Sequence, residues 1–386
     1  MGTRRAGVVV LAAVGLLVPS ACSAGRSLAT RRHSAPTSAA TPPPSTPPVS
    51  SSSLPTTTST SVPPPFPTTV GAWSSDLVAG TGGGTVTDLN PTTDAVYALD
   101  QAPIGTGPHT NARPLDYDLT TRRVLFGAPI SGADAMTVTG GWVWVVASEL
   151  DGSPAIVVYQ LDPTTLAVVR RQTLGAPFSQ AMTGTLTATV GGPLWVAGGS
   201  TLYALSPTTG AVVHDVSPGM DVSSMSTSPD GSVLYVVGSG DHANEPVVMA
   251  ELDARNGHTQ ARQVEEGGGA GSVAAARAGA WVAIRGGMHG ETALYRKADL
   301  RAVTTPGDYP SPYDWAMSES VDVSDDTLWL VSLQGLACAD PSTGTVRTGE
   351  PQVPSQIGSV VAHGGVLYGG GTGGLSVIGA PRACFG

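Results

Sequence analysis

The sequence predicts an all-β fold, a seven-bladed β-propeller of four-stranded antiparallel blades, and three observations lead to this expectation. A short motif of aliphatic and aromatic residues recurs seven times between about residue 70 and the C-terminus. A polar turn rich in Asp, Pro, Thr and Gly follows most copies. No long segment after the N-terminal leader has the periodicity of an amphipathic helix. Four short strands in each repeat of about 44 residues match the size of a propeller blade, and residues 70–386 are long enough for seven blades.

The first half of the repeat has the composition of a buried strand, because aliphatic and aromatic side chains follow one another without a charge, as in WVWVVA at 142–147. Its aromatic residues are Tyr97, Trp144, Trp195, Tyr235, Trp281, Trp329 and Tyr368. Since they recur at one position of the repeat, we expect them to pack between adjacent sheets rather than to bind a ligand.

The second half of the repeat is a strand that ends in a polar turn, as in LYALSPTTGAVV at 202–213. Such a turn is favoured because an Asp or Ser side chain accepts hydrogen bonds from the backbone that follows, Pro fixes φ, and Gly tolerates a positive φ. The predicted polar anchors of the turns are Asp118, Asp162, Ser206, Asp253, Asp299 and Asp340.

The two ends of the repeat region complement each other. The last repeat, from about Gly358 to Ala380, is one strand short of a blade, whereas the stretch Val70–Gly80 precedes the first repeat and is apolar enough to form a strand. We expect Val70–Gly80 to complete the last blade. This pairing would close the ring and cover sheet edges that otherwise invite aggregation.

Residues 1–21 are predicted to be a secretory signal peptide, because Arg4 and Arg5 precede the uncharged apolar stretch 6–18 and small residues follow it. The segment ending at Cys22 resembles a bacterial lipoprotein signal of the actinobacterial type. The resemblance implies that Cys22 is lipidated and anchors the chain at the outer face of the cell membrane. Secretion without an anchor is the alternative, because Pro19 stands where such signals usually have an aliphatic residue.

Residues 22–69 are predicted to be a disordered linker. Residues 26–69 contain 11 of the 32 prolines, Ser and Thr dominate the remainder, and Asp76 is the first acidic residue of the chain. A stretch of this composition buries too little apolar surface to offset the entropy of ordering it. About 40 Pro-rich residues extend on the order of 100 Å. We therefore expect a spacer between the membrane and a propeller domain at 70–386.

The repeats resemble two related families of propeller repeat. The segment VYQLDPTTLAVV at 158–169 is similar to the pyrroloquinoline-quinone-like repeat, and SPDGSVLYVV at 228–237 is similar to the YVTN-type repeat of lactonase-like propellers. The resemblance implies the fold and leaves the function open. Quinoprotein dehydrogenases of this kind have eight blades, docking tryptophans and often adjacent cysteines. Because this chain has no adjacent cysteines and its repeats end without a docking tryptophan, we expect no quinone or other cofactor.

Loops between the second and third strands of a blade form the first group of candidate site residues, since they lie at the end of a propeller where ligands commonly bind. The long loops are expected at 100–114, 239–246 and 286–292. Their candidate metal-binding or acid–base residues are His109, His242, Glu245, His289 and Glu291. Imidazole and carboxylate groups suit zinc and can also act as base and acid. The alternative is ordinary solvated loop residues, because no tight ligand spacing is present.

The second candidate is a loop between two blades, TPGDYPSPYDWAMSES at 304–319, which concentrates aromatic residues in a chain that is only 5% aromatic. Aromatic side chains on a rigid scaffold are effective binding anchors. The candidate ligand-binding residues are Asp308, Tyr309, Tyr313, Asp314 and Trp315. The alternative is that this loop packs over the central channel and plugs it.

The chain has three cysteines, so one of them must stay outside any intramolecular disulfide. If Cys22 is lipidated, Cys338 and Cys384 remain as a pair. We expect them to form a disulfide that fixes the C-terminus to the neighbouring blade.

The charge and composition of the chain exclude some classes of function. Residues 70–386 contain 14 Lys and Arg against 29 Asp and Glu, a net charge of −15, which excludes nucleic acid as a partner. No apolar run reaches the ~20 residues of a membrane span. The sequence favours a non-enzymatic, monomeric binding or scaffold module at the cell envelope, with an envelope protein or glycan as partner. The alternatives are a lactonase- or lyase-like enzyme that uses the loop His and carboxylate residues or a metal, and a purely structural spacer.

Overall fold

The computed structural model describes residues 73–101, 111–149, 155–175, 184–239, 246–265, 269–285, 291–306, 320–332, 335–350 and 357–385. These residues belong to one compact unit, Ser61–Gly386. The predicted signal peptide and the linker with Cys22 lie outside them. The described ranges fold into strands and one short 3-10 helix, η2 (Arg382–Cys384). None of their helical segments has the length and apolar character of a membrane span.

Five of the six sheets contain four antiparallel strands that follow one another in the sequence. They are β6 (Ala133–Thr139), β7 (Trp142–Glu149), β8 (Ala155–Leu161), β9 (Val168–Gly175); β10 (Thr185–Ala188), β11 (Leu194–Gly198), β12 (Thr201–Leu205), β13 (Val212–Val216); β14 (Asp221–Thr227), β15 (Val233–Ser239), β16 (Val247–Asp253), β17 (Thr259–Glu265); β18 (Gly269–Ala276), β19 (Gly279–Arg285), β20 (Glu291–Arg296), β21 (Ala302–Thr304); and β22 (Ser320–Ser324), β23 (Thr327–Ser332), β24 (Gly335–Ala339), β25 (Val346–Glu350).

The sixth sheet combines both ends of the described chain. Its strands are β26 (Ile357–His363), β27 (Val366–Gly379), β1 (Ser74–Pro91), β2 (Ala95–Gln101), β3 (Asn111–Asp118), β4 (Val124–Phe126) and β5 (Ile130–Ser131). Residues 74–80 of β1 pair with residues 374–379 of β27, whereas residues 85–91 of β1 pair with β2. The pairing of the N-terminal stretch with the last repeat therefore lies where the sequence predicted it.

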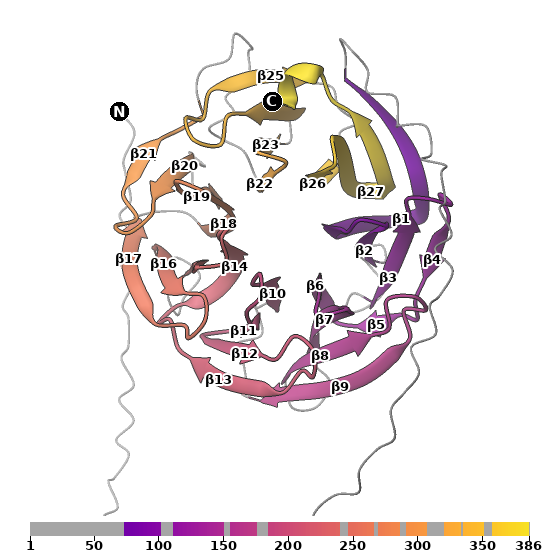
Figure 1. Cartoon of the computed structure of the whole chain (residues 1–386), viewed down its shortest axis with the longest axis horizontal. Helices are drawn as coiled ribbons and strands as arrows, with labels where there is room; N and C mark the ends of the chain where they lie inside the picture. Colours follow the sequence, from indigo (N-terminus) through magenta and orange to yellow (C-terminus); the bar gives the residue numbers. More distant parts are fainter. Residues whose placement is uncertain are drawn as a thin grey trace, which may run out of the picture. The chain divides into compact units, whose positions relative to one another are not determined.

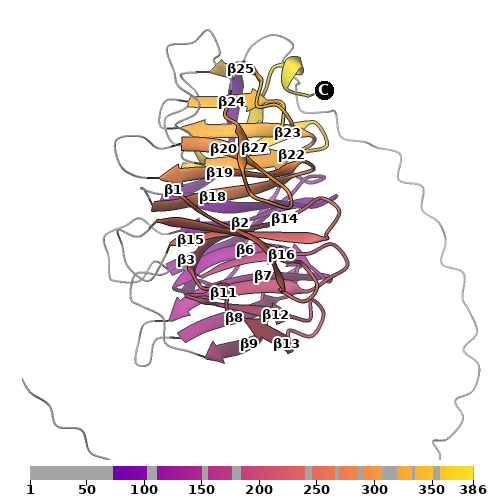
Figure 2. The same ribbon diagram turned by 90° about the vertical axis from the view of Figure 1, so that its left-hand side faces the viewer.

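The sheets are arranged around a central axis, as Figure 1 shows. Strands near the axis contact one another in the order β1, β6, β10, β14, β18, β22 and β26, and β26 contacts β1, with which it shares the sixth sheet. Figure 2 shows the strands from the side, with short turns joining them at one end. Successive antiparallel sheets packed radially in this way form a β-propeller. The predicted all-β propeller fold is confirmed.

The core lies between neighbouring sheets, and the repeated aromatic residues occupy it. All seven are at most 8% exposed. Trp195 Nε1 donates to the Ala254 carbonyl oxygen at 2.8 Å, and Trp281 Nε1 donates to the Pro341 carbonyl oxygen at 2.8 Å. Each acceptor lies in a turn of the next sheet. The repeats end without a docking tryptophan; Trp195 and Trp281, which bond to the next sheet, lie in the second strands β11 and β19 instead.

The turns that receive these tryptophans need glycine. Gly257 has a φ of +71°, and a Cβ atom there would lie 2.8 Å from the Trp195 ring. Gly344 has a φ of +72°, and its Cβ would lie 2.7 Å from the Trp281 ring. A side chain at either position would therefore combine a left-handed backbone with a clash against a buried indole. The Gly of the repeated turn is required by the docking contact as much as by the turn.

Five of the six predicted turn anchors are correct and one is wrong. Four anchor carboxylates and the Ser206 hydroxyl accept N–H bonds from the turn, for example Asp253 Oδ1 from Arg255 N at 2.9 Å. Between β20 and β21 the anchor position belongs to Arg296, whose N–H donates to the Arg301 carbonyl at 3.0 Å. Asp299 lies three residues later and accepts from Arg296 Nε at 3.0 Å. The Asp299 carboxylate binds the Arg296 side chain and is not the turn anchor. The prediction was wrong because it placed the anchor at the nearest Asp.

Side chains on the first strands join each sheet to the next around the axis. The bonds are Asn90 Nδ2 to Met136 O (2.9 Å), Gly184 N to Asp134 Oδ2 (2.7 Å), Thr227 Oγ1 to Ala188 O (2.8 Å), Ala275 N to Ser226 Oγ (3.0 Å), Val321 N to Ser272 Oγ (3.0 Å) and Ala362 N to Ser324 Oγ (2.8 Å). All of these strands except β1 are sheet edges, and the backbone groups of an edge need partners when they are buried. The bonds supply those partners and fix the sheets relative to one another.

A disulfide attaches the C-terminal segment to the sheet β22–β25. Cys338 in β24 is bonded to Cys384 in η2, with Cα atoms 5.6 Å apart and a sequence separation of 46. The Cys384 carbonyl also accepts from Thr327 Oγ1 at 2.6 Å and from Arg347 Nη1 at 3.2 Å. The disulfide and these two hydrogen bonds therefore all attach the segment around Cys384 to the same sheet.

Candidate functional site

The site residues predicted from the loops lie outside the described residues, apart from the backbone of one of them. His109, His242, Glu245 and His289 are among those outside, as is the whole aromatic group Asp308, Tyr309, Tyr313, Asp314 and Trp315. Glu291 begins β20, where its backbone pairs with Ile284. Within the described ranges, no three His, Cys, Asp or Glu side chains gather as a metal site would require.

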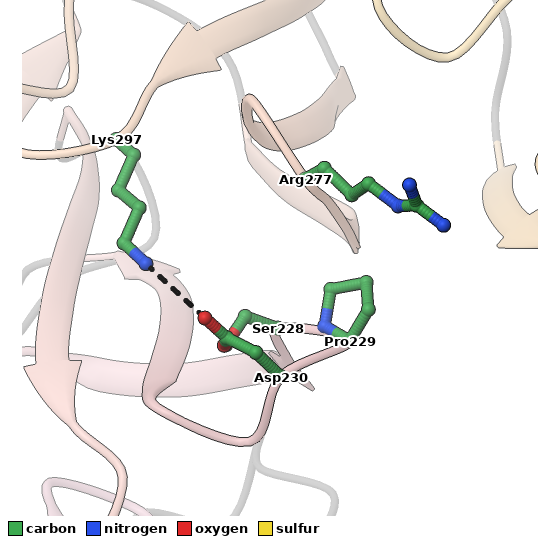
Figure 3. Close-up of a pocket in the computed structure, with 5 residues that line it drawn as sticks. All are labelled: Ser228, Pro229, Asp230, Arg277 and Lys297. Carbon is green, nitrogen blue, oxygen red and sulfur yellow. Dashed lines mark hydrogen bonds and ion pairs between the residues drawn. The ribbon is translucent and has the colours of Figure 1, made fainter.

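A pocket of about 370 Å³ is present at the seam between the sheets β14–β17 and β18–β21, and it was not predicted. It is lined by Ser228, Pro229, Asp230, Arg277 and Lys297, shown in Figure 3. The first three residues form the turn between β14 and β15, Arg277 lies in the turn between β18 and β19, and Lys297 follows β20. These turns lie at the end of the strands opposite to the long loops in which the candidate histidines were predicted.

The Asp230 carboxylate is held firmly as an anion. Ser228 Oγ donates to Asp230 Oδ1 at 2.6 Å, and the Ser232 N–H and hydroxyl donate to the same oxygen at 3.0 and 2.7 Å. The Ser228 hydroxyl also accepts from Val233 N at 2.9 Å. These hydrogen bonds, with the Lys297 charge as a smaller contribution, hold the pKa of Asp230 well below its usual range. Ser228 and Ser232 therefore support the turn.

Lys297 is the only lysine of the chain, and it replaces a residue that is apolar in the other turns. Its equivalents, one residue after the turn anchor, are Leu119, Pro163, Pro207, Ala254 and Pro341. Figure 3 shows the Lys297 amine directed at Asp230, with Nζ 3.7 Å from Oδ2. Nζ also donates to Ser232 Oγ at 3.3 Å. Both contacts are long, so the ammonium group keeps donor capacity for a ligand.

The seam that carries Lys297 lacks the docking bond found at other seams. Tyr97, which occupies the equivalent position in β2, donates its hydroxyl to the Pro163 carbonyl at 3.2 Å. Tyr235 is only 1% exposed, yet its hydroxyl has no partner among the described residues. Burial, with the nearby Glu251 and Asp230 carboxylates, raises the pKa of Tyr235. Burying a hydroxyl without a hydrogen-bond partner costs free energy, so the contact that Tyr235 makes with the next sheet is less stabilising than that of Tyr97.

Glu251 makes the contact that replaces the docking bond. Its carboxylate is 2% exposed and accepts from the Ala298 N–H at 2.8 Å. Ala298 has a φ of +81°, which is unfavourable for a residue with a side chain. The bond from Glu251 therefore holds the turn after β20 in a strained conformation, with Lys297 beside it at the pocket.

A second pocket of about 300 Å³ lies beside the first and shares Pro229 and Arg277 with it. It extends over the sheet β22–β25, where Arg277 Nη2 lies 3.4 Å from Asp326 Oδ1 and Arg347 Nη2 lies 3.5 Å from Asp340 Oδ2. The Arg277 and Asp326 side chains are 81% and 83% exposed. Ion pairs this exposed contribute little to stability, so Arg277 can change partner at small cost.

Carboxyl groups of the inner strands are a separate feature of the propeller. Burial raises the pKa of Asp88 to about 7 and the pKa of Asp134 and Asp322 to about 6. Asp134 accepts from Ser148 Oγ as well as from Gly184 N, and Asp322 accepts from Ser324 Oγ. Asp134 and Asp322 thus take part in hydrogen bonds within and between the sheets, and we assign them a structural role.

Comparisons with known proteins support the fold. The chain is similar to BamB from Moraxella catarrhalis, with 12% identity, a TM-score of 0.52, and 79% of this chain and 98% of that chain covered. It is also similar to the computationally designed Ika8 protein, with 11% identity, a TM-score of 0.50, and 78% and 98% covered. No family model and no curated protein sequence matches the chain. At these identities the likeness extends to the β-propeller fold alone.

The sequence contained one signal for the pocket. The turn Arg296–Leu300 departs from the Asp-Pro pattern of the other turns and places the only lysine of the chain next to an arginine. Periodicity predicted a turn there and gave no reason to expect a pocket, because its other walls come from turns near residues 229 and 277.

Proposed function

We propose that the chain is an exported binding or scaffold module at the cell envelope, a seven-bladed propeller joined by the linker 22–69 to a lipid at Cys22. The seven-stranded sheet is interpreted as two blades. One consists of β26, the two halves of β27 and residues 74–80 of β1, and the other consists of residues 85–91 of β1 with β2, β3 and β4. In this interpretation the N-terminal strand closes the ring, and the linker leaves the propeller from its last blade.

The observation that carries this proposal is the way successive sheets are fixed to one another. Side chains of the first strands bond to the neighbouring first strand, and indoles such as Trp195 and Trp281 bond to the neighbouring turn. Bonds near the central axis and bonds at the turns together make the scaffold rigid, so the surfaces at the two ends of the propeller keep their shape. A binding module needs such a surface, since little ordering entropy is then lost when a partner binds. Among the described residues that line the pocket there is no histidine or cysteine.

Partner binding is assigned to the loop 304–319, whose Tyr309, Tyr313 and Trp315 supply aromatic anchors. The partner is an envelope protein or glycan. The acidic charge of residues 70–386 favours a neutral or cationic partner over an anionic one. We propose that the chain acts as a monomer and touches the membrane only through its lipid.

Metal analysis of the purified full-length chain distinguishes this function from hydrolysis by the loop histidines. We expect no stoichiometric metal in the wild type, and no hydrolytic activity that depends on His242. The control is the His258→Ala variant, which removes an exposed histidine from the turn before β17. One zinc per chain that is lost in His242→Ala but kept in His258→Ala would contradict the proposal, as would a lactonase activity with the same pattern.

A further inference from the structure

We propose that the pocket between the sheets β14–β17 and β18–β21 binds the carboxylate of a small ligand, such as the C-terminus of a peptide, through Lys297 and Arg277. This site lies at the opposite end of the strands from Thr304, where β21 ends, and Ser320, where β22 begins. It is independent of the partner surface proposed above, so either can fail without the other.

The seam that forms the pocket is specialised compared with its neighbours. At the seams that contain Trp195 and Trp281, an indole N–H reaches the carbonyl oxygen of the residue after the turn anchor. At this seam Tyr235 has no such partner, and the turn is held instead by the buried Glu251 carboxylate. The equivalent residue here is Lys297, whose side chain extends across the seam to Asp230. The Trp144 indole also bonds within its own sheet, where Gln160 Nε2 donates to the Thr208 carbonyl of the next sheet at 3.2 Å, so the lysine is the feature particular to the pocket.

The charges that line the pocket fit a monoanion. The residues that line the pocket contribute two positive charges, from Lys297 and Arg277, and one negative charge, from Asp230, on a domain whose net charge is −15; Asp326, the exposed partner of Arg277, lies beside them. Distant acidic groups are screened over about 8 Å at physiological salt, so the local cations dominate inside the pocket. A dianion such as phosphate would meet the Asp230 and Asp326 carboxylates that flank the same cations.

The donors that remain available also fit a carboxylate. Ser228 donates to Asp230 and accepts from Val233 N, so its hydroxyl is already used. The guanidinium of Arg277 is highly exposed, and its planar fork matches both oxygens of a carboxylate. Lys297 Nζ, with its two long contacts, adds a second charge-assisted bond. Pro229 offers an apolar wall to the carbon next to the carboxylate.

The single lysine provides a direct test. In the full chain labelled with carbon-13 at lysine Cε, Lys297 gives one nuclear magnetic resonance signal, which can be followed during titration with N-acetylglycine at constant ionic strength. We expect a saturable shift with a Kd on the order of 1 mM, as suits a few exposed charge-assisted contacts. N-acetylglycinamide, which lacks the carboxylate, should leave the signal in place.

Variants separate the pocket from general electrostatics. Arg277→Gln should weaken N-acetylglycine binding about tenfold, a loss of about 1.4 kcal/mol in affinity. Arg255→Gln, an exposed arginine in the turn before β17, should bind like the wild type. Thermal melting checks that both variants are folded. An unchanged lysine signal, an equal shift with the amide, or an equal loss in Arg277→Gln and Arg255→Gln would each overturn the proposal.

Discussion

Replacing Trp195 with alanine should destabilise the propeller by about 3–5 kcal/mol, the usual result of truncating a fully buried tryptophan. The Trp195 side chain has no solvent exposure and packs with Met220, Leu234 and Leu252 of the next sheet. Its ring also covers Gly257 of the neighbouring turn. In a domain of this size we expect the midpoint of thermal unfolding, measured by circular dichroism, to fall by roughly 10 °C.

Trp195→Phe separates packing from hydrogen bonding. Phenylalanine keeps most of the buried ring but cannot donate to the Ala254 carbonyl, so we expect a smaller loss of about 1–3 kcal/mol. The comparison variant is Trp142→Ala, since Trp142 is half-buried and lies at the edge of its cluster. If Trp195→Ala melts at the wild-type temperature, or if Trp142→Ala is the more damaging change, the docking tryptophans do not hold the sheets together as described.

Removing the disulfide is the second change with a large expected effect. The bond between Cys338 and Cys384 closes a loop of 46 residues, so the chain-entropy model predicts a loss of roughly 3–4 kcal/mol for the Cys338→Ser/Cys384→Ser double variant. The C-terminal segment should then exchange its amide hydrogens faster, because it is attached to the sheet β22–β25 by its hydrogen bonds to Thr327 and Arg347 and by the packing of Phe385 on Trp329, without the covalent bond.

The thiol content provides the control for the double variant. After unfolding without reductant, the wild-type chain should expose no thiol from Cys338 or Cys384, and adding reductant should lower its melting temperature to that of the double variant. Reductant should leave the double variant unchanged. Two reactive thiols in unfolded wild-type protein purified under oxidising conditions would contradict the disulfide.

The strands were predictable from the sequence because each copy of the repeat concentrates aliphatic and aromatic residues between turn residues. Tyr97, Trp144 and Trp281 could be placed between sheets from their recurrence alone, and all three are buried. The anchor of the fifth turn could not be predicted, because Arg296 occupies that position with a side chain that cannot accept hydrogen bonds, while Asp299 three residues later has the residue type that the pattern favours.

The pocket could not be predicted, for a different reason. Its walls come from a turn near residue 229 in one sheet and from turns near residues 277 and 297 in the next, and periodicity does not state how the turns of neighbouring blades face each other. How two neighbouring turns face each other depends on the strand register within each sheet and on the contacts between adjacent sheets. The Tyr235 hydroxyl, which has no partner among the described residues, and the strained Ala298 cannot be read from composition or spacing.

The claim that the chain binds an envelope partner is tested most directly by mass spectrometry of what co-purifies with the full-length protein from solubilised membranes of its own cells. The Tyr309→Ser/Tyr313→Ser/Trp315→Ser variant should lose the partner by about 30-fold, as expected from one aromatic hot spot worth about 2 kcal/mol. The matched control, Val169→Ser/Val213→Ser, changes exposed apolar residues on the outer strands β9 and β13 and should retain it. Equal recovery of the partner with all three proteins, or no specific partner with any of them, would contradict the proposed function.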